Sequence, residues 1–95
     1  MNLSAAELMR NQAATLFDRG QPCGAEANMA KYLCSEASWE AAEAAMTTYG
    51  GYGVATEYDI ERKWKETRLL RTAPISNNLV LAYVAQHLLD KPRSY

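Results

Sequence analysis

The sequence has little cysteine and little histidine, which removes several classes of site. It contains Cys23, Cys34 and the single histidine His87. The two cysteines form no C-x-x-C pair and are too few for a disulfide framework, so we expect reduced thiols and a cytoplasmic protein. One histidine cannot build a site of several histidine ligands, and we expect no metal.

A strong charge of either sign is also absent. Ten Lys and Arg residues against eleven Asp and Glu residues give a formal net charge of -1. This balance argues against binding to nucleic acid or to an anionic membrane surface. No apolar run approaches the ~18 residues of a membrane span, and we find no signal-peptide pattern. The 95 residues leave room for one domain, residues 1–95.

What the sequence does contain is helical periodicity, because apolar residues recur at i, i+3 and i+4 and β-branched residues never alternate. We expect helices over about residues 3–17, 25–48 and 58–70, and a fourth that starts after Ser76 and ends before Lys91. The predicted fold class is all-α, an up-down helical bundle of four segments. In the second helix we expect one inner stripe rich in alanine, which favours close helix pairing. Its members are Met29, Leu33, Ala37, Ala41 and Ala44 or Ala45.

Glycines and polar residues mark the ends of these helices. Gly50 and Gly51 begin a Gly-Gly-Tyr-Gly turn that ends the second helix, and we expect both to adopt the left-handed αL conformation, with positive φ. Such a turn can also bring backbone N–H groups close to a phosphate, although the residues alone favour a plain helix cap. Thr56 and Asp59 form a weak capping box, and Ser76 is a good N-cap.

Other chemistry-bearing residues have simpler interpretations. We interpret the basic run from Arg62 to Arg71 as the solvated face of a helix, paired locally with glutamates. His87 lies on an apolar face, which favours packing over catalysis. We interpret Glu36, Glu40 and Glu43 as a solvated carboxylate face in preference to metal ligands. For the aromatic residues, core or interface packing and an aromatic ligand contact explain the pattern equally well. These residues are Trp39, Tyr49, Tyr52 and Tyr58.

Three segments in order resemble the C-terminal domain of acyl-CoA dehydrogenases. Residues 27–33 (ANMAKYL) and 37–40 (ASWE) look like a helix of that family. Residues 45–53 (AMTTYGGYG) look like the turn that follows it, usually A-hydrophobic-Q-hydrophobic-hydrophobic/aromatic-G-G-x-G. Residues 57–62 (EYDIER) match the family's E-Y-P-hydrophobic-E-R/K, with Asp59 in place of the proline.

The resemblance implies most of a C-terminal four-helix domain, without its first helix and completed by oligomerisation. The family uses FAD to dehydrogenate acyl-CoA thioesters between Cα and Cβ, passes electrons to an electron-transfer flavoprotein and is usually tetrameric. By this resemblance, Thr47, Tyr49, Gly50 and Gly51 would contact a flavin bound mainly by a neighbouring subunit. Thr47 replaces the usual glutamine.

The main departure from the family lies at residues 72–78 (TAPISNN). Many members read I-Y-E-G-T-x-E/Q here, and the glutamate is their catalytic base, whereas this chain has Pro74. Ser76 and Asn78 match the family's next polar positions and are expected to contact flavin. We therefore expect an inactive fragment of a flavoenzyme of fatty acid metabolism that supplies flavin contacts and subunit assembly. The alternative is a stand-alone helical interaction module that binds no cofactor.

Overall fold

A computed structural model describes residues 1–93 and consists of helices and connecting turns over that range. The helices are α1 (Asn2–Asp18), α2 (Gly24–Tyr49), α3 (Ile60–Leu70) and α4 (Asn77–Leu88). Two short 3₁₀-helices, η1 (Gly50–Val54) and η2 (Thr56–Tyr58), connect α2 to α3. The all-α prediction and all four helical segments are confirmed, with ends that differ by one or two residues from those expected.

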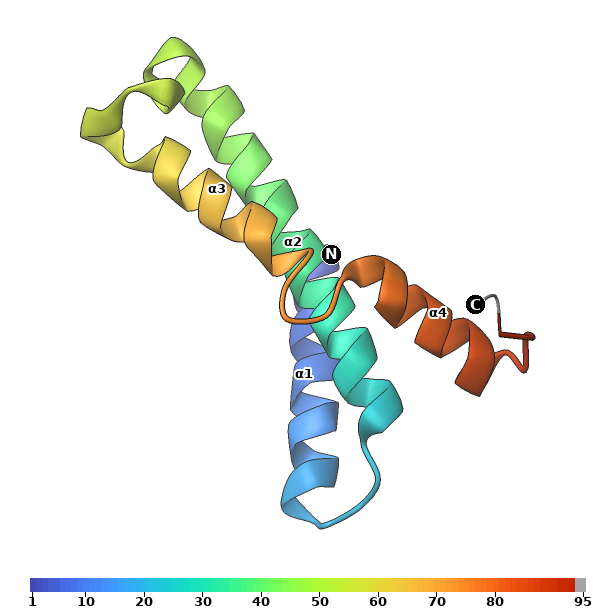
Figure 1. Ribbon diagram of the computed structural model, residues 1–95. Helices are drawn as coiled ribbons and strands as arrows, with labels where there is room; N and C mark the ends of the chain where they lie inside the picture. Colours follow the sequence, from blue (N-terminus) through green and yellow to red (C-terminus); the bar gives the residue numbers. More distant parts are fainter. Residues whose placement is uncertain (94–95) are drawn as a thin grey trace.

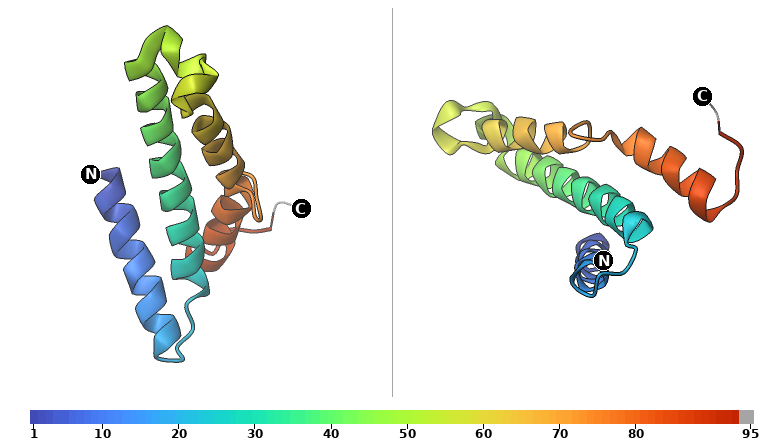
Figure 2. Two further views of the ribbon diagram at one scale, coloured as in Figure 1. Left: turned by 90° about the vertical axis from the view of Figure 1, so that its left-hand side faces the viewer. Right: turned by 60° about the horizontal axis from the view of Figure 1, so that its bottom comes forward.

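Helix α2 is the spine of the molecule (Figure 1). Helix α1 runs antiparallel to its first half, and α3 runs antiparallel to its second half beyond the turn at the tip (Figures 1 and 2). Helix α4 crosses the first half of α2 and extends away from it. In the described residues α1, α3 and α4 each pack on α2 and not on one another. The arrangement is therefore three helices on a central one, which leaves the bundle open.

The exposed surface area and the radius of gyration both show how open the bundle is. The chain exposes 6810 Å², whereas a folded monomer of its mass typically exposes about 5,500 Å². Its radius of gyration is 16.0 Å, against about 12 Å for a compact domain of this length. Ala6, Ala30 and Val80 are the hydrophobic residues that are buried in the described part of the chain. Much apolar side-chain surface therefore faces solvent, and its largest contributors include Leu3, Leu8, Phe17, Leu69 and Leu89.

Small residues are buried where the helices pack, but the predicted single stripe on α2 is wrong at Ala41. Ala6 of α1 and Ala30 of α2 are buried, and alanine at such positions permits close approach of the two helices. Ala41 and Ala44 are exposed, whereas Ala45 is partly covered. The reason is that α2 changes partners along its length, from α1 and α4 to α3.

No helical segment in the described part of the chain combines the length and the apolar character that crossing a bilayer requires.

Candidate functional site

The turn at the tip of the molecule begins at Gly50, which has φ 55° and ψ -133°. These angles are close to those of the first central residue of a type II′ turn, a conformation that glycine adopts without steric cost. Gly50 therefore has the predicted positive φ, but its ψ is not that of the predicted αL conformation. The prediction is wrong at Gly51, because the positive-φ glycines of the described chain are Gly20 and Gly50. One reversed residue suffices to redirect the chain here, since η1 continues with right-handed backbone.

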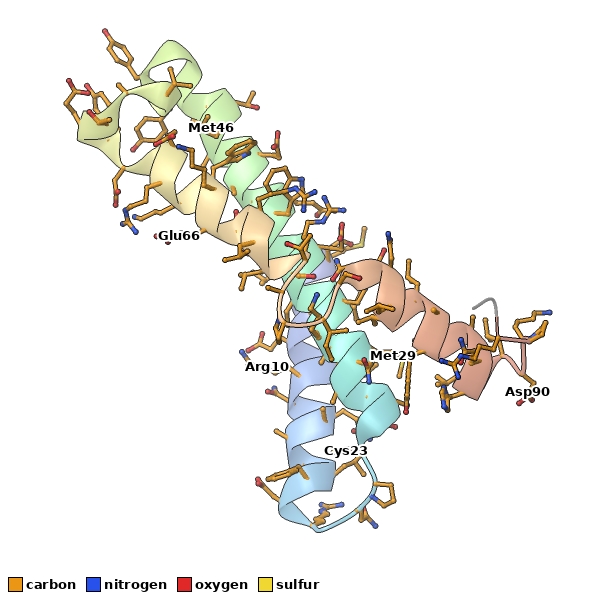
Figure 3. All side chains as sticks on the ribbon, viewed as in Figure 1. Arg10, Cys23, Met29, Met46, Glu66 and Asp90 are labelled. Atoms are coloured by element: carbon orange, nitrogen blue, oxygen red, sulfur yellow. The ribbon has the colours of Figure 1, made fainter. Side chains whose placement is uncertain are left out.

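The third glycine of the turn has a different role that the sequence did not reveal. Gly53 is buried, and a Cβ added to it would lie 3.1 Å from the carbonyl oxygen of Met46. The turn therefore folds back onto the last part of α2, where Met46 is labelled in Figure 3. By contrast, a Cβ at Gly50 or Gly51 would meet no atom within 4 Å. The outer side of the turn is open at these two residues.

The other predicted residues at the tip are exposed. The Thr47 hydroxyl donates to the carbonyl oxygen of Glu43, one turn earlier in α2. Tyr58 lies between Tyr49 and Tyr52, with ring centroids 5.7 and 5.4 Å apart. Aromatic contacts of this kind stabilise a turn that has little other core, and they show that the three tyrosines pack on one another.

Helix α3 begins differently from the prediction. Asp59 has φ 62° and its side chain makes no capping bond, so the expected capping box does not form. Its carboxylate instead accepts two 2.6 Å hydrogen bonds from Arg62, which lower the pKa of Asp59. A proline has φ fixed near about -65° and cannot take this conformation. The local backbone thus suits the aspartate that this sequence has where the family has proline.

The basic face of α3 mostly behaves as predicted. Arg62 pairs with Glu66, and Lys65 pairs with Glu61, both across one helical turn at the surface. Figure 3 shows Glu66 on the outer side of α3, away from α2. Such exposed pairs each contribute little to stability. Arg71 is the exception, because it turns inward to Glu36 of α2.

The first turn of α4 carries the second group of predicted residues. Ser76 is the N-cap, and its hydroxyl oxygen accepts a hydrogen bond from the Leu79 amide at 3.3 Å, as predicted. Asn78 is exposed, and so is Pro74 in the preceding connection. A polar hollow of about 140 Å³ opens beside this turn. Its lining residues are Arg68, Arg71, Thr72, Ser76, Asn77 and Asn78.

A partly buried polar cluster lies under this turn, and the sequence analysis missed it. Asn77 is 8% exposed and bonds to Glu36, Ser35 and Lys31 of α2. The prediction that Glu36 belongs to a solvated face is therefore wrong. Burial lowers the pKa of Lys31, while the nearby carboxylate of Glu36 opposes that shift. The sequence signal was the asparagine after an N-cap serine, but asparagine is common at such positions for local reasons.

The two predicted groups do not form one pocket. Asn77 contacts Glu36, whereas Thr47 lies eleven residues further along α2. At about 1.5 Å of rise per residue these places are about 17 Å apart along the helix. Figure 1 shows the same separation between the tip turn and the start of α4. The arrangement can contact an extended ligand at two places, or two ligands at one place each.

The remaining candidates are dispersed. Glu40 accepts from the amide of Asn2, and Glu43 accepts from the indole of Trp64, so both also have partners on other helices. Within residues 1–93 no three His, Cys, Asp or Glu side chains gather as metal ligands. His87 is exposed, and its ring stacks on that of Tyr83 with the ring centroids 4.1 Å apart. His87 therefore packs against its own helix and not in a core.

Comparisons with known proteins agree with the residues that carry the resemblance. Residues 1–89 match the family described as acyl-CoA dehydrogenase, C-terminal domain. The chain is similar to acyl-CoA dehydrogenase FadE12 of Mycobacterium tuberculosis, with 45% identity over all of this chain and 25% of that protein. It is 32% identical to a 3-(aryl)acrylate reductase of Clostridium sporogenes, over 92% of this chain and 23% of that protein.

A solved structure gives the same answer for the fold. One chain of known structure superposes on this chain with a TM-score of 0.87. Its structure is described as "Electron transferring flavoprotein of Acidaminococcus fermentans: Towards a mechanism of flavin-based electron bifurcation". The sequences are 27% identical, and the match covers 95% of this chain and 24% of the other. This chain thus spans about a quarter of the length of the relatives that it matches. It belongs to the acyl-CoA dehydrogenase family and corresponds to the C-terminal domain of those proteins.

Proposed function

We propose that this domain contacts FAD in a complete acyl-CoA dehydrogenase-type enzyme and contributes to its assembly. The observation that carries the proposal is the open backbone at Gly50 and Gly51, where a Cβ at either residue would meet no atom within 4 Å. Exposed glycines allow a ligand to approach the main chain closely. The open side of the turn therefore leaves room for the adenosine and pyrophosphate part of the cofactor. Thr47 and Tyr49 flank the same open edge.

The start of α4 supplies the second contact. Ser76 accepts a hydrogen bond from Leu79, and its own proton makes no hydrogen bond within the described residues. It can therefore cap the helix and donate outward at once. Asn78 is exposed beside it. Because the two contact regions are about 17 Å apart along α2, they suit a cofactor held between subunits, with each region facing a different part of the assembly.

Bound FAD would supply the hydride acceptor for dehydrogenation of an acyl-CoA thioester. The chain itself lacks a base at the expected place, because the ring of Pro74 carries no group that can take a proton. We infer that the proton acceptor lies outside these residues and that the chain alone is inactive. The acyl-CoA substrate, the electron-transfer flavoprotein, the role in fatty acid metabolism and the cytoplasmic location belong to the complete enzyme in this proposal.

The open fold supports the assembly part of the proposal. Ala41 and Glu40 lie on an exposed face of α2, beside the start of α1. A hollow there is lined by Leu3, Ala37 and Ala41, among others. In our proposal the chain holds all but the first helix of the domain, and that helix or a second copy covers this surface. The assembly is a homodimer or homotetramer.

Titration with flavin tests the cofactor assignment. We expect FAD to bind saturably and more tightly than FMN, because FMN lacks the adenosine that we place at the tip turn. Visible absorbance of the protein, measured with each flavin added and then removed by gel filtration, gives both affinities. No binding at high FAD concentration would favour the cofactor-free interaction module, and equal affinity for the two flavins would contradict the adenosine contact.

A further inference from the structure

Three helices meet at one partly buried polar cluster formed by Glu36 of α2, Arg71 at the end of α3 and Asn77 at the start of α4. One carboxylate oxygen of Glu36 accepts from Nε of Arg71 at 2.8 Å and from Nδ2 of Asn77 at 2.6 Å. The backbone amide of Asn77 donates to the carbonyl oxygen of Arg71 at 2.9 Å. Each of the three residues is therefore bonded to the other two.

Asn77 is also fixed from its other side. Its Oδ1 accepts from Nζ of Lys31 at 2.5 Å and from the hydroxyl of Ser35 at 3.0 Å. Ser35 is only 4% exposed, so these bonds lie where water competes weakly and hydrogen bonds to charged groups are strong. No side-chain nitrogen or oxygen that is buried in the described residues lacks a partner. The buried polar atoms of the cluster are therefore all hydrogen-bonded.

Arg71 is held by a second kind of contact. Its guanidinium lies 5.7 Å from the ring centroid of Trp39, a geometry typical of cation–π interaction. Trp39 in turn packs on Trp64 of α3, with ring centroids 5.1 Å apart. The contact between α2 and α3 thus orients Arg71, and α4 is not needed for that orientation.

Helix α4 depends on this cluster because it has few other supports. In the described residues it packs on α2 and on neither α1 nor α3. Its buried hydrophobic residue is Val80, which is 1% exposed and lies over an apolar patch that includes Met29 and Leu33. Apolar contact is non-directional, so it can hold α4 on α2 without fixing its tilt or rotation. Directional bonds at Asn77 supply that missing constraint.

Asn77 lies between the two residues that we assign to flavin contact, Ser76 and Asn78. We propose that Glu36, Arg71 and Asn77 are positioning residues that fix the first turn of α4 and so aim Ser76 and Asn78. The flavin part of this inference rests on the proposed function. The positioning itself does not, because it is a property of α4 in the unliganded chain.

Two substitutions at Glu36 separate geometry from charge. Glu36→Gln removes the negative charge, and Glu36→Asp keeps the charge but withdraws the carboxylate by one methylene. Removing a negative charge near an anionic cofactor would by itself tighten binding. A positioning role predicts the opposite, a loss of FAD affinity of about five- to tenfold in both variants, comparable with losing one ordinary hydrogen bond. Glu66→Gln is the matched control, because Glu66 pairs with Arg62 on the exposed side of α3, and α3 does not pack on α4 in the described residues.

Hydrogen exchange measured without flavin tests the positioning role separately from the proposed flavin binding. The amides of Leu79 and Val80 bond to Ser76 in the first turn of α4, and their hydrogen exchange reports how firmly that turn is held. We expect both Glu36 variants to exchange about tenfold faster there and the control to be unchanged. Unchanged exchange, or FAD binding that tightens in Glu36→Gln, would overturn the positioning role. Faster exchange in a chain whose wild type binds no flavin would support the positioning and overturn the proposed function instead.

Discussion

Replacing Gly50 with valine is expected to lower the free energy of unfolding by about 2–3 kcal/mol. The residue has φ 55° and ψ -133°, and a β-branched side chain is strongly disfavoured at positive φ. The strain is conformational, because a Cβ at this place meets no neighbouring atom. Denaturant unfolding followed by far-UV circular dichroism gives the difference. If the domain binds FAD, the same variant should also bind it more weakly, because the added side chain occupies the open side of the turn.

Gly51→Val is the matched control for that experiment. Gly51 is adjacent, exposed and equally open, but it does not have positive φ. We expect a loss of no more than about 1 kcal/mol, the ordinary range for a surface substitution with some change in backbone preference. Equal losses in the two variants would show that the turn is not held by the reversed backbone at Gly50.

The chain is expected to associate with itself in solution. It exposes 6810 Å², about 1,300 Å² more than is typical for a folded monomer of its mass. That excess is larger than the ~800 Å² per partner that a standard protein interface covers. Apolar side chains at Leu3, Leu8 and Phe17 of α1 contribute to it, and removing apolar surface from water favours association.

Light scattering at low micromolar concentration measures this association. We expect a molar mass of at least twice the 10.6 kDa of the chain. Dilution should lower the mass and the melting temperature together, because the folded state is then coupled to assembly. A monomer that melts cooperatively would contradict the assembly proposal and would show that the open helices are stable without a partner.

Local features of the sequence were sufficient to predict where the helices lie. Their ends are determined by short-range chemistry, such as the serine cap at Ser76 and the reversed backbone at Gly50. The burial pattern was harder to predict. A prediction of one buried stripe along α2 assumes that the same neighbouring helix packs along its whole length. The structure instead gives α2 different neighbours at its two ends, which leaves Ala41 exposed and Ala45 partly covered.

The individual residues of the candidate site could be predicted from the sequence. The hydrogen-bonded cluster that supports them could not. Glu36 and Arg71 are separated by 35 residues and looked like members of two solvated faces. Only the packing of α3 and α4 on α2 brings them to Asn77, and no periodicity within one helix encodes that meeting. Asp59 shows the same limit on a smaller scale, because its positive φ arises from the 3₁₀ connection rather than from a local capping motif.

Hydrogen exchange with and without FAD tests the central claim most directly. The experiment follows every backbone amide of the chain, mixed with FAD at a concentration that saturates any flavin absorbance change. We expect slower exchange at the tip turn, around Thr47 to Gly51, and at the first turn of α4, around Ser76 to Asn78. The intervening part of α2 should change little, because the two contacts are about 17 Å apart. Protection confined to other segments, or no protection at either turn, would contradict the account.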